Sequence, residues 1–384
     1  MEGLGAPAGP PRGRASQTPE RVSSANRTHP LPREGGWGEG TPVSALSKTP
    51  NLDDLRRYAI ARSLFAPLGL SAALNRLGFV QADPIRAPAR AQDLILRHRV
   101  KGYAAGELEG RYPRLAVEED FFINYGFLPR EIQALMHPRV ALNPWTPAQG
   151  KRAREVLAFV RERGPTHPRD VDAHFQHGEV RNWFGGKSKA STLLLDGMHY
   201  RGLLRVARRD AGTRVYQAAP PWPQAADPAE QQARLDRLVD LAVAHYAPLP
   251  AASLAQLVGM LRGAAPQWAD DRRRALTAAK ARLAQARIDG VDWFWPAGER
   301  PQRAVEQTSA LRLLAPFDPV VWDRRRFELF WGWAYRFEAY TPAAKRQLGY
   351  YALPLLVGSR VLGWATLTLA EGQLRCEAGL VNGA

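Results

Sequence analysis

The spacing of apolar residues divides the chain into a polar first segment and a periodic remainder. Residues 1–49 are rich in Gly, Pro, Ser and Thr, and their apolar residues are too sparse and irregular to mark a helix or a strand. From Leu52 onward apolar residues recur at helical spacing, and Gly78 closes a second short helix that begins at Ser71. We therefore expect a disordered tail, or a misplaced start, over residues 1–49 and a helical, winged-helix-like N-terminal domain over residues 50–145.

The next periodic segment, residues 146–220, has the order of a winged helix. Apolar residues mark one helix that Gly164 and Pro165 end, and Pro168 stands where a first-turn proline would begin a second helix. A third helix is predicted from Ser188 to about Arg201. Two alternating strands, 203–207 and 213–217, then flank a basic tip, as expected for the wing that contacts phosphates. Winged helices also serve as protein-contact modules, so the pattern alone leaves the partner open.

Two further domains complete the predicted organisation. Residues 221–300 predict helices near 228–246, 251–261 and 271–286 and a strand at 291–295, which form a second helical or winged-helix-like domain. Beyond Leu311 the period changes to two. The strands expected there are one carrying Trp331, Trp333, Tyr335 and Phe337, and two more at 350–356 and 361–369. Residues 301–384 therefore predict a small β domain, and the predicted fold class is mainly α with β, with tandem winged helices before that domain.

The charge balance adds a partner to this picture. The 384-residue chain has 53 Lys and Arg against 37 Asp and Glu, a net charge of +16. The first 50 residues hold six basic and four acidic residues, a net of +2, so +14 lies in the predicted folded part. Such an excess favours nucleic acid over a neutral membrane, although GC-rich coding would also raise the Arg content. The cations that we expect to contact DNA are Arg86, Arg90, Arg97, Arg99, Lys187, Lys189, Arg208 and Arg209.

Other features of the composition limit the location and the chemistry. Apolar runs fall short of the roughly 18 to 20 residues that cross a membrane, and the N-terminus lacks the pattern of a signal peptide. Cys376 is the single cysteine, which excludes an internal disulfide and a thiolate zinc cluster. We expect a monomer in the cytoplasm, associated with the nucleoid, that needs neither metal nor cofactor.

The candidate chemistry lies in the extended segment that follows Gly78. Gln81 and Asp83 alternate there, so their side chains project to the same side, where an amide and a carboxylate could hold one water. A helix carrying Arg86, Arg90, Arg97 and Arg99 is expected after Pro84. Asp83 would then be a good N-cap for that helix, and from spacing alone the cap is the favoured role.

Sequence strings in two parts of the chain resemble one known family. Residues 77–85 (LGFVQADPI) and 89–96 (ARAQDLIL) look like the active-site segment of the winged-helix DNA glycosylases that unhook interstrand crosslinks, the YcaQ-like and AlkZ-like family. Residues 316–326 (PFDPVVWDRRR), 340–346 (YTPAAKR) and 349–351 (GYY) resemble its C-terminal signature. The likeness spans residues 50–384. Similar proteins continue past the position of Ala384 into another helix, so the resemblance predicts a truncated C-terminal domain.

The resemblance implies a monofunctional DNA glycosylase that hydrolyses the N-glycosidic bond of N7-alkylated purines in double-stranded DNA, alkylated or crosslinked. Gln81 and Asp83 would be its catalytic residues. The crosslink-unhooking members carry a His on a hairpin after the Leu115 region, where this chain has none, so crosslink unhooking is implied less directly than release of a monoadduct. The alternative from another class is a non-catalytic winged-helix regulator of transcription, in which Asp83 is only a cap.

Overall fold

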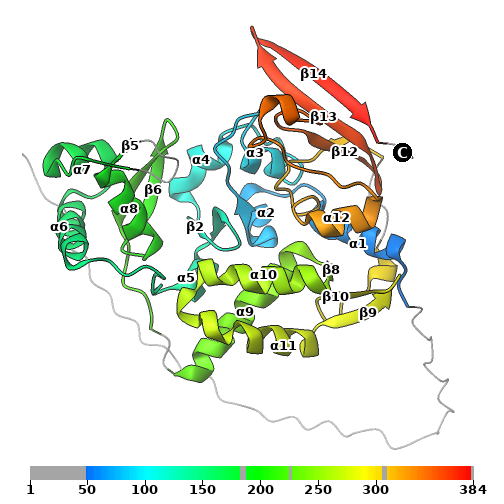
Figure 1. Cartoon of the computed structure of the whole chain (residues 1–384), viewed down its shortest axis with the longest axis horizontal. Helices are drawn as coiled ribbons and strands as arrows, with labels where there is room; N and C mark the ends of the chain where they lie inside the picture. Colours follow the sequence, from blue (N-terminus) through cyan, green and yellow to red (C-terminus); the bar gives the residue numbers. More distant parts are fainter. Residues whose placement is uncertain (1–48, 182–186, 225–226, 305–308, 382–384) are drawn as a thin grey trace, which may run out of the picture. The chain divides into compact units, whose positions relative to one another are not determined.

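The computed structural model describes residues 49–181, 187–224, 227–304 and 309–381, all of which belong to one compact unit (Figure 1). The predicted tail lies outside the described residues, apart from Thr49. Helices and small antiparallel sheets alternate along the chain, so the expected combination of α and β structure is found. Among the described residues, no helix is both long and apolar enough to cross a bilayer.

A three-stranded sheet organises the N-terminal segment. Its order is β1-β3-β2, and Gln81 on β1 pairs with Gly126 on β3. A Cβ at Gly126 would lie 2.4 Å from the carbonyl oxygen of Val80, so only glycine allows this close approach of the two strands. The elements are α1 Leu52–Ser63, α2 Leu70–Leu77, β1 Val80–Gln81, α3 Ala91–Leu96, α4 Glu107–Arg111, η1 Tyr112–Arg114, β2 Val117–Phe121, β3 Tyr125–Pro129 and α5 Arg130–Met136.

The predicted helix after Pro84 is wrong. Residues 82–90 are irregular, and α3 begins only at Ala91, with Arg90 at its N-cap. Two prolines, Pro84 and Pro88, lie in this stretch, and each removes a backbone donor and disfavours helical geometry in the residue before it. Asp83 therefore cannot be the N-cap of this helix.

The segment from α6 to β7 has the predicted order of helices and hairpin. Thr146 forms a capping box with Gln149 at the start of α6, and Pro168 is the first residue of α7. Strands β6 and β7 join through a two-residue turn in which Ala211 and Gly212 both have positive φ. The elements are α6 Pro147–Arg163, α7 Pro168–Phe175, β4 Glu179–Arg181, β5 Lys187–Lys189, α8 Ala190–Tyr200, β6 Leu204–Asp210 and β7 Thr213–Ala218.

Three helices and a three-stranded sheet follow. Helices α9, α10 and α11 pack on one another, and the sheet has the order β8-β10-β9 (Figure 1). The third helix is shorter than predicted, because the backbone becomes extended at Leu283 and residues from Ala284 pair with β10 instead. The elements are α9 Pro228–Tyr246, β8 Leu249–Pro250, α10 Ala251–Ala264, η2 Pro266–Asp271, α11 Arg272–Arg282, β9 Ala284–Ile288 and β10 Val291–Trp295.

The C-terminal segment contains a four-stranded sheet of order β11-β12-β13-β14. The predicted strand with four alternating aromatic residues is wrong: Trp331 ends helix α12, Gly332 terminates it with φ of +67°, and residues 333–338 are irregular. Trp331 and Tyr335 instead donate hydrogen bonds to backbone carbonyls of Ser359 and Ala352. The elements are η3 Pro301–Arg303, β11 Arg312–Leu313, α12 Arg324–Trp331, η4 Ala343–Lys345, β12 Leu353–Val357, β13 Arg360–Ala370 and β14 Gln373–Leu380.

Candidate active site

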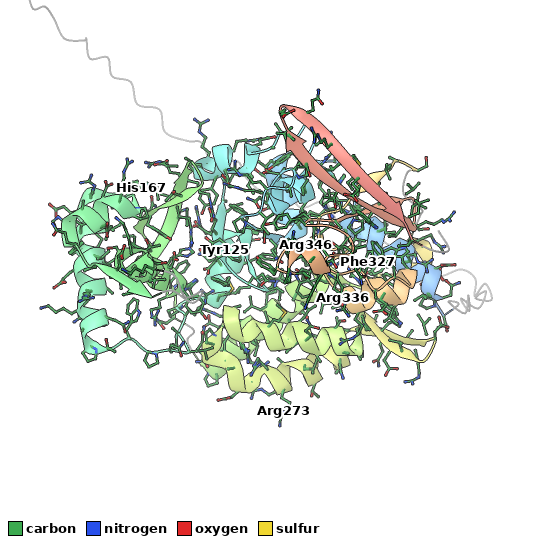
Figure 2. The ribbon with its side chains drawn as sticks, turned by 45° about the horizontal axis from the view of Figure 1, so that its top comes forward. Tyr125, His167, Arg273, Phe327, Arg336 and Arg346 are labelled. Carbon is green, nitrogen blue, oxygen red and sulfur yellow. The ribbon has the colours of Figure 1, made fainter. Side chains whose placement is uncertain are left out.

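A cavity of about 360 Å³ lies between the segment that follows β1 and the segment from α7 to β7. Asp83 and Tyr125 line it on the first side, and Asp196, Arg209 and Arg214 line it on the second. Tyr125, labelled in Figure 2, belongs to this lining and is the first residue of β3. Carboxylates, guanidinium groups and an aromatic ring therefore converge on a space that water can enter.

Asp83 sits at the edge of this cavity in an irregular turn. Its Oδ1 accepts a hydrogen bond from the backbone N of Ile85 at 2.8 Å, and its own N–H faces Oε1 of Gln92 at 3.4 Å. Among the described residues, no Lys or Arg side chain forms an ion pair with this half-buried carboxylate. Loss of water raises the pKa of Asp83 above its usual 3.8, and the bond from Ile85 opposes that effect. The carboxylate is thus partly desolvated and still free to accept a proton.

Gln81 ends β1 two residues before Asp83, is only 7% exposed and is not among the residues that line the cavity. Its Oε1 accepts two hydrogen bonds, from Nδ2 of Asn124 at 3.2 Å and from Nε1 of Trp322 at 3.1 Å. Neither partner was predicted, because both are distant in sequence. Asn124 belongs to the turn between β2 and β3, and Trp322 lies 241 positions after Gln81. The structure therefore brings the C-terminal signature into contact with the predicted catalytic segment.

Strand β2 carries two buried acids that the sequence did not single out. Glu118 binds Arg205 with distances of 2.6–3.0 Å, and Glu119 accepts from Nε of Arg209 at 2.9 Å and from the hydroxyl of Tyr125 at 2.8 Å. Both arginines come from β6, so these pairs join the first sheet to the helix and hairpin segment. Part of the basic charge of that segment is therefore neutralised inside the protein.

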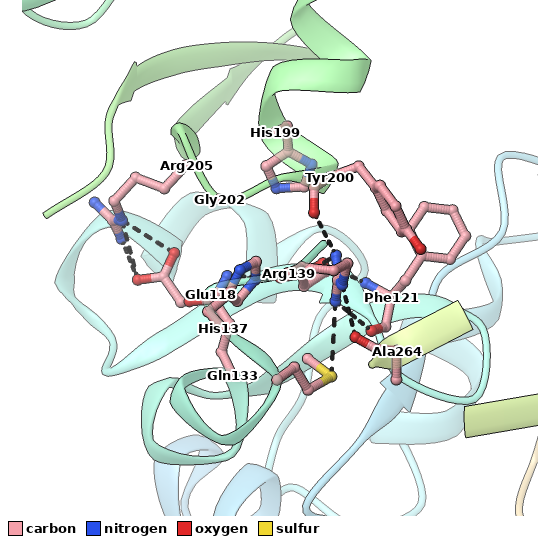
Figure 3. Close-up of polar contacts among 12 residues, drawn as sticks. Glu118, Phe121, Gln133, His137, Arg139, His199, Tyr200, Gly202, Arg205 and Ala264 are labelled. Carbon is pink, nitrogen blue, oxygen red and sulfur yellow. Dashed lines mark hydrogen bonds and ion pairs between the residues drawn. The ribbon is translucent and has the colours of Figure 1, made fainter. Parts of the chain in front are cut away.

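The third acid of β2, Asp120, is fully buried and pairs with Arg139, whose contacts are drawn in Figure 3. It accepts from Arg139 at 2.9 Å, from Gln133 at 2.9 Å and from Nε2 of His137 at 2.7 Å. Arg139 also donates to the carbonyls of Phe121, Tyr200 and Ala264, which belong to three different segments. Burial alone would raise the pKa of Asp120, but the charge of Arg139 and the hydrogen bond from His137 hold it well below the usual range.

The C-terminal signature forms a second buried support near Gln81. Asp318 pairs with Arg99 at 2.8 Å, both side chains being fully buried, and its Oδ1 also accepts from the N–H of Val320. Asp323 caps α12, and the buried Arg326 donates to the carbonyls of Tyr246, Pro319 and Val320. The signature residues thus fix the loop that carries Trp322.

Of the eight predicted DNA-binding cations, one is buried, two pair with acids beside the cavity and five are exposed. Arg99 is fully buried, so its predicted contact with DNA is wrong, and Arg209, 15% exposed, is engaged by Glu119. Arg90 pairs with Glu109 and lines the cavity. The remaining predicted cations are exposed at the surface: Arg86, Arg97, Lys187, Lys189 and Arg208.

The described residues hold no cluster of three or more His, Cys, Asp or Glu side chains that could bind a metal ion. The cavity itself brings together the carboxylate of Asp83, which has no ion-pair partner among the described residues, the guanidinium groups of Arg209 and Arg214, and the phenol of Tyr125.

Comparison with known proteins agrees with the resemblance seen in the sequence. A solved structure with a similar fold is the DNA glycosylase AlkZ of Streptomyces sahachiroi, with a TM-score of 0.56 and 14% sequence identity; the match covers 87% of this chain and 92% of that chain. The sequence model of the AlkZ-like DNA glycosylases matches residues 74–382, which include Gln81, Asp83 and the whole C-terminal signature. The chain therefore belongs to the AlkZ-like family of DNA glycosylases.

Proposed function

We propose that the protein hydrolyses the N-glycosidic bond of N7-alkylated purines in double-stranded DNA, with Asp83 and Gln81 as its catalytic residues. The observation that carries the proposal is the half-buried carboxylate of Asp83, which lines the cavity and lacks a cationic partner among the described residues. Membership of the AlkZ-like family indicates the reaction class, and the cavity offers a space in which that reaction could take place.

The chemistry of the substrate fits a site with one carboxylate. Alkylation at N7 gives the purine a positive charge, so the base leaves with the electrons of the glycosidic bond and becomes neutral without an acid. The sugar left behind resembles an oxocarbenium ion, which a nearby anion stabilises. A water molecule then forms the new bond to the sugar and transfers a proton to Asp83, whose raised pKa makes it a better acceptor than an exposed aspartate. Gln81 holds that water.

We also propose that Pro147–Ala218 and Pro228–Trp295 are winged helices. Each has helices followed by a β-hairpin, and the second has the sheet order β8-β10-β9. In the first segment α8 and the hairpin contribute Asp196, Arg209 and Arg214 to the cavity, so DNA bound along this segment would reach Asp83. Lys187, Lys189 and Arg208 lie exposed on this segment, each beside an acidic residue, and we expect them to exchange that partner for a phosphate when DNA binds.

The test is a base-release assay with the wild-type protein. A duplex that contains N7-methylguanine should yield free base and an abasic site, and a duplex with an N7-linked interstrand crosslink serves as the second substrate because the same bond is broken there. Binding to both duplexes without release from either would contradict the proposal and favour the non-catalytic regulator. In that alternative Asp83 would only stabilise the turn after β1, where its Oδ1 accepts from the N–H of Ile85, since it does not cap a helix.

A further inference from the structure

The side-chain amide of Gln81 is held at one end by two donors that come from distant parts of the chain. Asn124 lies in the hairpin turn of the first sheet, and Trp322 lies in the loop before α12. The indole ring of Trp322 packs against Tyr246, with ring centroids 4.5 Å apart, so the position of its N–H is fixed by packing. Neither residue lines the cavity that contains Asp83, and Gln81 itself borders it only through its neighbour Ala82.

The two contacts determine which way the amide faces. An indole N–H can only donate, so the Gln81 atom that faces Trp322 must be the carbonyl oxygen. A rotation of the amide by 180° would place its NH2 group against the indole N–H and the NH2 group of Asn124, where three donors would meet without an acceptor. Gln81 is 7% exposed, so little water is available to relieve that conflict. Its Nε2 is therefore directed away from both donors.

We propose that Trp322 and Asn124 are positioning residues, which fix the Gln81 amide so that its NH2 group, and not its oxygen, meets the water that Asp83 activates. This inference rests on the proposed glycosylase function. The proposal gives Trp322, the tryptophan of the C-terminal signature, an indirect role. It acts through Gln81 and contacts neither the substrate nor the water. The water accepts a hydrogen bond from the Gln81 NH2 group through one lone pair and donates one proton to Asp83. Its second lone pair is then free to attack the sugar.

The decisive experiment is a double-mutant cycle with Trp322→Phe and Gln81→Ala. Phenylalanine keeps an aromatic ring against Tyr246 and removes the N–H. Trp322→Phe should slow single-turnover base release about fivefold to tenfold, the scale of one lost hydrogen bond, while DNA affinity and melting temperature stay close to those of the wild type. In the Gln81→Ala background the same change should alter the rate less than about twofold, because Trp322 then has nothing to hold.

A merely structural role of Trp322 would give a different result. The rate would then fall by the same factor in both backgrounds, or would not fall at all, and either outcome would overturn the proposal. The matched control is Trp331→Phe, which removes an indole N–H that donates to the carbonyl of Ser359 at 3.0 Å in the same C-terminal segment. This control should leave the rate of base release unchanged.

A second measurement tests the geometry without relying on catalysis. The indole N–H signal of Trp322, assigned by its absence in Trp322→Phe, should exchange with solvent at least about tenfold faster, and shift, when Gln81→Met removes the acceptor. The indole signal of Trp331 should be unaffected. If the wild type releases no base but the Trp322 signal responds, the proposed function fails while the contact stands; an unchanged Trp322 signal would refute the positioning role itself.

Discussion

Two aspartates near the same small sheet have opposite environments. Asp120 is fully buried on β2 and is satisfied by Arg139, His137 and Gln133, whereas Asp83 is half-buried beyond β1 with one backbone donor. The pKa of Asp120 is lowered by its partners, and the pKa of Asp83 is raised by loss of water. The difference separates a carboxylate that holds segments together from one that is available for reaction.

The comparison also explains how a reactive group can be kept in a precise place. The segments around Asp83 are joined by pairs that do not involve it: Glu118 with Arg205, Glu119 with Arg209, and Asp318 with Arg99. Removal of Asp83 should therefore affect chemistry more than folding, and removal of Asp120 should do the reverse.

The largest change in stability is expected for Asp120→Asn. This variant leaves Arg139 as a buried charge without its anion, so the free energy of unfolding should fall by about 3 kcal/mol or more. Denaturant unfolding followed by circular dichroism measures it. Asp53→Asn is the control, because Asp53 is a 63% exposed member of a surface pair and should change the midpoint very little. Equal midpoints for the two variants would show that the Asp120 network does not join the segments.

The largest change in activity is expected for Asp83→Asn. Asparagine can still accept the hydrogen bond from the N–H of Ile85, so the melting temperature should stay near that of the wild type. Base release should fall on the order of a hundredfold or more, because the negative charge and the proton acceptor are both lost. Single-turnover kinetics on duplex DNA with N7-methylguanine measures the rate. Release at the wild-type rate would remove Asp83 from the mechanism.

The two carboxylates should also respond differently to pH. Base release needs ionised Asp83, so its rate should rise with pH through a midpoint above the usual 3.8, and Asp83→Asn should lack that step. Stability should fall on acidification in two steps. The first begins below about pH 6.5, because burial lowers the pKa of His137, His199 and His245, so the unfolded chain binds more protons. The second begins below about pH 4, where the unfolded chain takes up the proton that Asp120 resists. Parallel profiles of rate and stability would contradict this separation.

A smaller effect is expected at the exposed surface. Arg208, 46% exposed, should contact a phosphate, so Arg208→Ala should reduce the slope of log affinity against log salt by about 0.9. Arg287, 68% exposed on the β9–β10 hairpin, provides the matched variant in the other segment. An equal loss of slope in both variants would show that DNA contact is not confined to Pro147–Ala218.

Local sequence patterns predicted most helices, but they failed where contacts between distant parts of the chain determine the local conformation. The starts of α6, α7 and α9 follow from Thr146, Pro168 and Asp227, whose caps act within a few residues. The alternating aromatics at 331–337 imitate a strand, but Trp331 and Tyr335 donate to carbonyls beside the C-terminal sheet, and Trp333 packs against Phe327 of α12. The prediction of a helix directly after Pro84 did not take account of Pro88, although this helix-breaking residue is plain in the sequence.

The candidate site was only partly visible in the sequence. Gln81 and Asp83 were identified through the family resemblance, since spacing alone favoured a helix cap. The acids 118–120 carried a usable signal, three consecutive carboxylates between apolar residues in a basic chain, because such groups need cationic partners when buried. Nothing in the local sequence could connect Trp322 to Gln81, since that contact exists only after the C-terminal segment has folded against the first sheet.

The contact between Gln81 and Trp322 also bears on how the protein is made. The two residues are 241 positions apart, and at roughly 5–20 residues per second a ribosome needs about 12–48 s to proceed from one to the other. The partner of Arg99 is similarly late, because Asp318 follows it by 219 positions. An unfinished chain can therefore expose the Gln-x-Asp segment, yet the amide becomes fixed only after Trp322 has been synthesised. Assembly of the site has to wait for the segment that carries Asp318 and Trp322.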